Sequence, residues 1–221
     1  MGKRLFDLVA ALSALAVLLP LMGVAALAIK LSDPGPVLYR ATRAGRHGKP
    51  FTMFKFRTMR VHGAGSVITA AQDDRIFPLG QLLRKLKVDE IPQLFNVLLG
   101  QMSIVGPRPE AIDIVRYHYH AAHMETLDVL PGLASPGSIY NYTHGEQVIG
   151  QENPERDYLD KLLPIKLGLE LVYVRRRSLC YDLAIIVRTL MVILQMAMGR
   201  RRFPRPPEYD EACREHLHAR P

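Results

Sequence analysis

Two adjacent carboxylates, Asp89 and Glu90, follow a basic segment that contains Arg84, Lys85 and Lys87. They stand where a helix is predicted to begin, so a carboxylate, the positive end of a helix and several cations can converge on one phosphate group. In such a site a carboxylate acts as the nucleophile that forms an acyl-phosphate, or as a ligand of Mg²⁺. A structural alternative is that Asp89 caps the helix and Glu90 complements its dipole. Residue types and spacing leave both interpretations open.

Three further cations are candidate phosphate ligands. The tripeptide Pro107-Arg108-Pro109 places a guanidinium between two residues of fixed φ, which lowers the entropy lost when the side chain is held in one orientation. A guanidinium held in this way can grip a diphosphate through two hydrogen bonds, although a structural turn is equally consistent with the motif. Lys55 and Arg57 alternate with phenylalanines, so a strand would place both on one face.

Other kinds of site are disfavoured. His118, His120 and His123 do not share one helical face, so we interpret them as solvated histidines rather than metal ligands. Phosphate-loop, dinucleotide-binding and nucleophile-elbow motifs are absent. Two cysteines are too few for a disulfide framework, which favours a reducing compartment.

The net charge of +8 is concentrated in two parts of the chain. Residues 1–60 carry ten basic and two acidic residues, and residues 171–205 carry eight arginines and one aspartate. Both segments contain or border a strongly apolar stretch, and a basic residue beside an anionic membrane contributes roughly 1 kcal/mol to binding. This distribution favours a membrane surface, and not nucleic acid, as the partner of the basic residues.

The run Leu8–Ile29 holds 22 residues without a charge, and about 20 suffice to cross a bilayer. Pro20 lies inside the run, where it removes a backbone hydrogen bond, and both flanks are basic. Because basic flanks remain on the cytoplasmic side, we predict a re-entrant hairpin bent at Pro20. The alternatives are a kinked spanning helix and a cleaved signal peptide, whose apolar core would be shorter.

The remaining pattern predicts a mainly α fold with short β segments. Strands are expected at residues 37–40 and 51–56, a loop at 61–74, and helices at 79–86, 89–99, 111–130, 158–174 (interrupted near Pro164) and 179–198. Residues 133–157 are rich in Gly, Ser, Asn and Thr and predict a substrate loop or an irregular platform. The apolar helix at 179–198 suits either the membrane interface or the protein core.

These elements predict three parts. Residues 1–30 form a re-entrant helix-break-helix membrane anchor, and residues 31–203 form a catalytic domain at the membrane interface with amphipathic helices. Residues 204–221 are Pro-rich and charged and are expected to be a loose tail.

Several short motifs occur in a fixed order along the chain. They are Lys3-Arg4-Leu5-Phe6-Asp7, Asp33-Pro34-Gly35-Pro36, Gly48-Lys49-Pro50-Phe51, Lys55-Phe56-Arg57-Thr58-Met59, Val88-Asp89-Glu90-Ile91-Pro92-Gln93-Leu94, Asn96, Met102-Ser103 and Val105-Gly106-Pro107-Arg108-Pro109. In this order they resemble the bacterial sugar transferase family, the monotopic polyprenyl-phosphate phosphoglycosyl transferases. The resemblance is dense from residue 3 to about residue 110 and returns at Lys166–Leu190.

The resemblance implies a re-entrant helix bent at a proline and an enzyme on the cytoplasmic face of the bacterial inner membrane. Such enzymes transfer a phospho-sugar from a UDP-sugar to undecaprenyl phosphate, release UMP, and so begin a surface glycan or exopolysaccharide. By position it implies that Asp89 attacks the β-phosphate and holds the phospho-sugar covalently. Glu90 would be its acidic partner, and Mg²⁺ would bind at Asp89.

The resemblance also assigns phosphate contacts to Lys55, Arg84 and Arg108, and a substrate-site position to Glu170, where the family often has Asp. Leu19 replaces a serine that often precedes the bend proline. Many members follow Pro-Gly with a segment Gln-Val-Asn-Gly-Arg that bears on nucleotide-sugar recognition, whereas Leu133–Gln147 has no arginine. Neither the sugar nor the oligomeric state is therefore predicted. Two rival functions remain: a one-step transfer in which Asp89 only binds metal, and a non-catalytic membrane-anchored assembly subunit.

Overall fold

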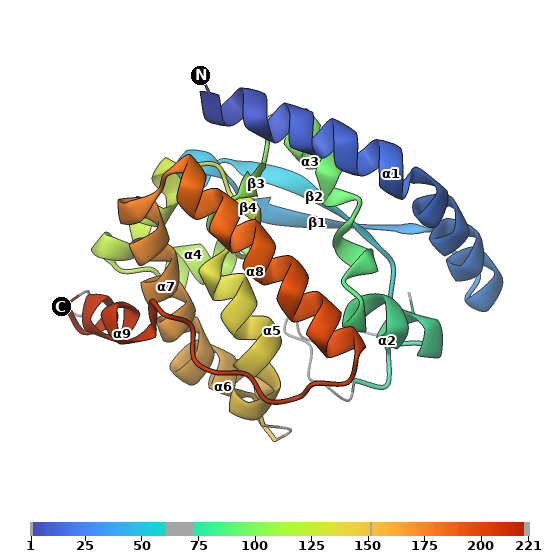
Figure 1. Ribbon diagram of the computed structural model, residues 1–221. Coiled ribbons are helices and arrows are strands. Elements are labelled where there is room, and N and C mark those ends of the chain that lie inside the picture. Colours follow the sequence, from blue (N-terminus) through green and yellow to red (C-terminus); the bar gives the residue numbers. More distant parts are fainter. Residues whose placement is uncertain (1, 61–72, 151, 219–221) are drawn as a thin grey trace.

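The computed structural model describes residues 2–60, 73–150 and 152–218, so most of the predicted loop at 61–74 lies outside the described residues. The chain is mainly helical with short strands, which confirms that part of the predicted fold class (Figure 1). In chain order the helices and strands are α1 (Gly2–Ser32), β1 (Leu38–Ala44), β2 (Pro50–Phe56), α2 (Pro78–Lys85), α3 (Gln93–Leu98), β3 (Ser103–Val105), α4 (Ile112–His118), β4 (Gly132–Ala134), α5 (Pro136–Val148), α6 (Pro154–Asp157), α7 (Leu163–Arg176), α8 (Leu179–Ala197) and α9 (Tyr209–His218). Three 3₁₀-helical segments, η1 (Arg46–Gly48), η2 (Val88–Glu90) and η3 (Ala121–Asp128), and one π-helical turn, η4 (Tyr158–Leu162), connect some of them.

The two predicted strands are confirmed and form an antiparallel hairpin, in which Tyr39 of β1 lies opposite Lys55 of β2. A buried asparagine of α3 fixes this hairpin against the helical part. Asn96 accepts a hydrogen bond from the Phe54 amide at 3.0 Å and donates to the carbonyl of Thr52 at 2.7 Å. The hairpin therefore holds Lys55 at a set distance from the turn that precedes α3.

Helix α1 is continuous through Pro20, where a helix-break-helix was predicted. Proline lacks an N–H and its ring crowds the preceding turn, and a bend accommodates both without ending the helix. Figure 1 shows the two halves of α1 running in different directions. Near its start, buried Asp7 accepts hydrogen bonds from the hydroxyl of Ser103 at 2.9 Å and the amide of Ile104 at 3.0 Å, and these join α1 to β3.

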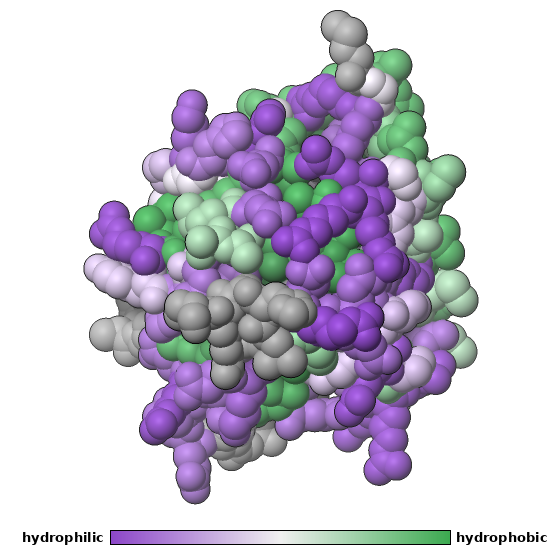
Figure 2. Space-filling model, turned by 90° about the vertical axis from the view of Figure 1, so that its left-hand side faces the viewer, coloured by the Kyte–Doolittle hydropathy of each residue, from purple (hydrophilic) through white to green (hydrophobic). Residues whose placement is uncertain are grey.

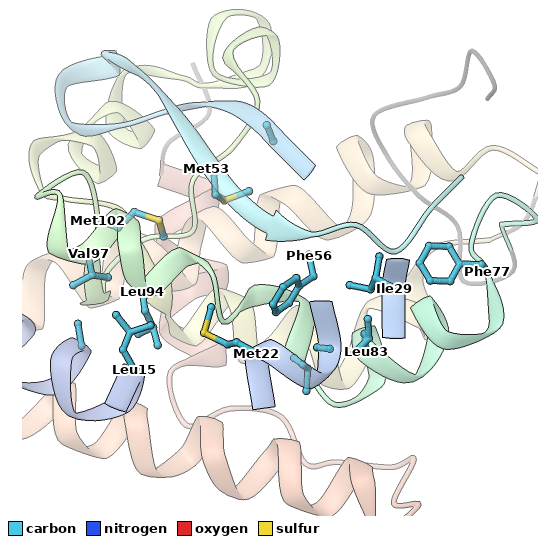
Figure 3. Close-up of a cluster of buried hydrophobic side chains, with 14 residues drawn as sticks. Leu15, Met22, Ile29, Met53, Phe56, Phe77, Leu83, Leu94, Val97 and Met102 are labelled. Carbon is cyan, nitrogen blue, oxygen red and sulfur yellow. The ribbon is translucent and has the colours of Figure 1, made fainter. Parts of the chain in front are cut away.

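One face of α1 forms part of the protein core. Its buried apolar side chains lie against residues of β2, α2, α3 and the turn between α2 and α3 (Figure 3). The members from α1 are Ala11, Leu15, Met22, Ala25 and Ile29. The apolar segment is therefore in packing contact with the part of the chain that follows it. The opposite face of α1 leaves large apolar residues such as Val17, Leu19 and Val24 exposed.

Helix α8 is apolar and mostly exposed, with Leu183, Leu190 and Leu194 each at least half accessible. Its buried residues are Asp182 and Ile185, so the alternative of a core helix does not hold. In Figure 2 the apolar residues gather towards the edge on which α8 lies, whereas the facing surface is mostly hydrophilic. By length and composition alone, α1 and α8 could each cross a membrane.

The expected helix at 111–130 is interrupted. Tyr119 and His120 have extended backbones between α4 and the 3₁₀ helix η3, and the His120 amide donates to the ring of His123 at 3.2 Å. This geometry directs Tyr119 into the cluster around α7 and buries His123, so the interpretation of all three histidines as solvated is wrong for His123. His118 and His120 are exposed, as expected.

Residues 133–157, predicted to be irregular, form β4, α5 and α6. Ser135 caps α5 by accepting a hydrogen bond from the Ser138 amide at 2.9 Å, and Pro136 occupies the first turn. Packing of Ile139 and Tyr140 into two hydrophobic clusters then outweighs the weak helix propensities of the segment. The irregular-platform prediction is therefore wrong.

The tail from residue 204 is also ordered where described. Glu208 is buried and accepts hydrogen bonds from Arg188 at 2.7 and 3.0 Å and from Tyr181 at 2.8 Å. After it, α9 packs on α7, with Ala212 fully buried. The segment forms a helix because this packing gives its apolar face a partner, so the expectation of a loose tail is wrong.

This packing predicts that Gly168→Ala destabilises the fold. A Cβ at Gly168 would lie 2.3 Å from the carbonyl oxygen of Ala212, so α9 must move away from α7, at a cost of about 1–3 kcal/mol. Gly23→Ala is the matched control, because a Cβ there has nothing within 4 Å and raises the helix propensity of α1. Thermal unfolding of both variants in detergent tests the prediction, and equal midpoints would contradict it.

Candidate active site

The two carboxylates lie in the turn η2, directly after Lys87, whose backbone is left-handed with φ 57°. Helix α3 begins afterwards at Gln93, with Pro92 as its N-cap residue. Neither Asp89 nor Glu90 therefore caps α3, and the alternative in which Asp89 serves as a helix cap is wrong. Both side chains are more than nine-tenths buried.

Glu90 is held by partners from three separate elements. Arg108 binds it with both terminal nitrogens, Nη2 to Oε1 at 2.6 Å and Nη1 to Oε2 at 3.2 Å. Lys55 of β2 lies 3.1 Å from Oε1, and the hydroxyl of Tyr142 on α5 donates to Oε2 at 3.0 Å. Burial alone would raise the pKa of Glu90, but Arg108 and Lys55 outweigh it and hold the pKa well below its usual range. Glu90 is thus a fixed anion that neutralises nearby cations.

Asp89, unlike Glu90, has a carboxylate oxygen that forms no hydrogen bond with the described residues. Its Oδ1 is buried and has no hydrogen-bond partner in the described part of the chain. Burial, and then the charge of Glu90, raises its pKa, whereas Lys55, Lys87 and Arg84 act to lower it. A carboxylate with an uncommitted oxygen among cations can attack an electrophilic phosphorus or bind a cation.

Arg108 is positioned by the loop between β3 and α4. Gly106 and Gly132 approach so closely that a Cβ on Gly132 would lie 2.0 Å from the Gly106 amide nitrogen, which places the loop against β4. The buried carboxylate of Glu170 then accepts from the Arg108 amide at 3.2 Å and from the Ser135 hydroxyl at 2.7 Å. Glu170 therefore holds the backbone of Arg108 in place through the Arg108 amide.

Arg84 and Lys87 complete the positive charge. Arg84 donates from Nε to the hydroxyl of Thr58 at 2.9 Å, and its charge acts on Asp89 without a direct bond. Lys87 places Nζ 3.7 Å from the ring centroid of Tyr142. Burial lowers the pKa of Lys87 to about 8, against the opposing effect of Glu90.

The structure brings Lys55 and Arg108 into direct contact with Glu90, and the charges of Asp89 and Arg84 act on the same cluster. Sequence reasoning did not single out Tyr142, because its segment was interpreted as irregular. A helical pattern starting at the Ser135-Pro136 cap is the signal that could have placed it. Lys87 was noted only as part of a basic helix.

The residues present fit one Mg²⁺ ion only in part. No cluster of three or more His, Cys, Asp or Glu that could hold a metal occurs among the described residues. Glu90 is committed to Arg108 and Lys55, whereas the free oxygen of Asp89 is a suitable ligand. Because Mg²⁺ often binds through one or two carboxylates together with substrate phosphates, Asp89 and a bound diphosphate would suffice.

The buried Glu170 predicts a pH-dependent stability. Burial raises its pKa from 4.5 to about 7, although Ser135 and the Arg108 amide oppose the shift. Between these values the unfolded chain ionises and the folded chain does not, so stability falls as pH rises, by roughly 3 kcal/mol in total. Glu170→Gln cannot ionise and should therefore gain stability relative to the parent between pH 5 and pH 8.

Thermal unfolding of parent and variant at the two pH values provides the measurement. Glu125→Gln is the control, because Arg175 lowers the pKa of that half-exposed carboxyl and its replacement should give no gain at high pH. A difference between parent and Glu170→Gln that is the same at both pH values would contradict the prediction.

The amino-acid sequence is similar to that of a known protein family and of several relatives. Residues 1–196 match the family model described as "Bacterial sugar transferase". The chain is 38% identical over 199 residues to a UDP-glucose:undecaprenyl-phosphate glucose-1-phosphate transferase of Caulobacter vibrioides, covering 87% of this chain and 69% of that protein. It is 37% identical over 191 residues to the Escherichia coli protein of the same name, covering 85% and 39%.

The name of a third relative specifies N-acetylgalactosamine in place of glucose. This is a UDP-N-acetylgalactosamine-undecaprenyl-phosphate N-acetylgalactosaminephosphotransferase of Aeromonas hydrophila, 33% identical over 196 residues, covering 87% of this chain and 43% of that protein. The chain thus spans less than half the length of the second and third relatives. The matched part contains the cluster around Asp89 and ends before α9.

Proposed function

The chain belongs to the bacterial sugar transferase family, and from this premise we propose that it transfers a phospho-sugar from a UDP-sugar to undecaprenyl phosphate, with release of UMP. The observation that carries the proposal is the division of roles in the buried carboxylate pair. Glu90 is fully engaged by cations, whereas Asp89 keeps an uncommitted oxygen beside Lys55, Lys87 and Arg84.

The proposed reaction has two steps on Asp89. A carboxylate oxygen of Asp89 attacks the β-phosphorus, the bond from that phosphorus to the bridging oxygen breaks, and UMP leaves with the electron pair. An oxygen of undecaprenyl phosphate then attacks the same phosphorus and releases the carboxylate. Fixed cations such as Lys55 and Arg108 stabilise the charge that develops on the phosphoryl oxygens. Mg²⁺, when bound by Asp89 and the diphosphate, would supply further neutralisation of phosphate charge.

Membrane placement is part of the proposal. The exposed apolar faces of α1 and α8, with basic residues at their ends, suit the interface of an anionic leaflet, with the catalytic cluster on the cytoplasmic side. Because α1 packs on the domain along most of its length, we propose that it enters and leaves the membrane on that side.

Cysteines placed at Gly2 and Arg46 should then react with impermeant reagents from the same side of sealed vesicles, and labelling from opposite sides would mean a spanning helix.

One assay tests the reaction against its rivals. The purified protein is incubated with each member of a panel of UDP-sugars that includes UDP-glucose and UDP-N-acetylgalactosamine, with and without undecaprenyl phosphate, and UMP is measured. The two-step reaction predicts a stoichiometric release of UMP without lipid and repeated turnover with it. Release only with lipid would indicate a one-step transfer in which Asp89 binds metal. No release with any UDP-sugar would favour a non-catalytic assembly subunit.

A further inference from the structure

Helix α5 brings one aromatic side chain into the catalytic cluster. The hydroxyl of Tyr142 donates to Oε2 of Glu90 at 3.0 Å and accepts from Nη1 of Arg108 at 3.1 Å. Together with the direct bond from Arg108 to Glu90, these contacts close a ring of three hydrogen-bonded groups. A phenol has one donor and two acceptor positions, so Tyr142 can make both contacts at once.

The ring of Tyr142 makes a second and separate contact. Nζ of Lys87 lies 3.7 Å from its centroid, within the range of a strong cation–π interaction. Lys87 is held in a left-handed backbone conformation two residues before Asp89, and such a conformation persists where its surroundings fix it. The lysine is therefore held both by its backbone and by the aromatic face.

The ammonium of Lys87 is surrounded by charged groups of the cluster. Asp89 and Glu90 attract it, whereas Arg108 and Lys55 repel it. Glu90 is already bound to Arg108 and Lys55, so the contact with the Tyr142 ring adds to the attraction of Asp89 in holding Lys87 near its cationic neighbours. Tyr142 thus links α5 to this arrangement of charges through Glu90, Arg108 and Lys87.

Building on the proposed function, we propose that Tyr142 is a positioning residue with two separable roles. Its hydroxyl orients Glu90 and Arg108 for the chemical step, and its ring holds Lys87 where the ammonium binds the diphosphate of the donor. The two roles predict different kinetic effects when the hydroxyl and the ring are removed one at a time.

The experiment compares Tyr142→Phe with Tyr142→Leu, using UDP-glucose and undecaprenyl phosphate in detergent. Tyr142→Phe keeps the ring and should lower kcat about tenfold while KM for UDP-glucose stays within about twofold of the parent. Tyr142→Leu keeps the site apolar but has no π face, so it should lower kcat similarly and also raise KM about tenfold. Tyr140→Phe is the control on the same helix, because Tyr140 packs on Tyr209 outside the cluster.

Each outcome decides the question. Thermal unfolding midpoints near that of the parent exclude misfolding as the cause of lost activity. A parent-like kcat for Tyr142→Phe, or equal KM values for the two Tyr142 variants, would overturn the inference. If the parent releases no UMP from any UDP-sugar, the proposed function fails. Calorimetric binding of UDP-glucose then tests the ring separately: weaker binding by Tyr142→Leu than by Tyr142→Phe supports it, and equal binding overturns it.

Discussion

Asp89→Asn is expected to reduce sugar-phosphate transfer at least about 10³-fold, because the amide cannot attack the β-phosphorus or form an acyl-phosphate. The parent, incubated with donor and no lipid, should gain the mass of one phospho-sugar, and the variant should gain none. Intact-protein mass spectrometry and UMP release measure the two effects. The mass of the parent also distinguishes the one-step transfer, because in that reaction the parent forms no covalent intermediate and gains no mass.

The loss should not arise from unfolding. Burial disfavours the charged form of Asp89, and its Oδ1 has no hydrogen-bond partner among the described residues, so an amide at this position costs little stability. We expect the unfolding free energy to change by less than about 1 kcal/mol. Asp128→Asn, at an exposed carboxylate away from the cluster, controls for the loss of one negative charge and should retain activity. Parent-like turnover by Asp89→Asn would refute the assignment.

The sequence predicted those elements whose signals are local. The periodic leucines of α2 and the apolar run of α8 required no partner to be recognised, and the alternating residues of the hairpin were equally clear. The interruption at Tyr119 and the ordering of α9 depend on contacts with α7, which is distant in sequence from α4 and η3. A prediction from neighbouring residues could not include those contacts.

In the candidate site, too, the sequence identified individual residues but not the contacts between distant segments. Residue types identified Asp89, Glu90 and Arg108, but the spacing of Asp89 and Glu90 could not say which carboxylate is engaged and which is free. That difference is set by Lys55 and Arg108, which reach Glu90 from separate elements. Glu170 stays a predicted substrate-site residue, and the contacts that the structure adds are those with the Arg108 amide and the Ser135 hydroxyl, which spacing alone could not foresee.

Arg108→Leu is expected to have the second largest effect, because it removes the bidentate partner of a buried carboxylate. Lys55 and Tyr142 still contact Glu90, so the loss of stability should be about 3 kcal/mol, at the lower end for a broken buried pair. Glu90→Gln should cost a similar amount, because it leaves two cations without their anion. Activity should fall at least about 10²-fold in either variant.

The double variant Glu90→Gln with Arg108→Leu separates the structural role of the pair from its chemical role. Because Arg108 and Glu90 are removed together and only Lys55 remains without its anion, the double variant should lose about as much stability as either single variant, which gives a coupling free energy of about 3 kcal/mol. Activity should not return, since the guanidinium that stabilises the phosphoryl charge is still missing. Thermal unfolding and UMP release on the four proteins measure both quantities. Additive losses of stability would show that the pair is not coupled, and recovered transfer would show that Arg108 serves only to neutralise Glu90.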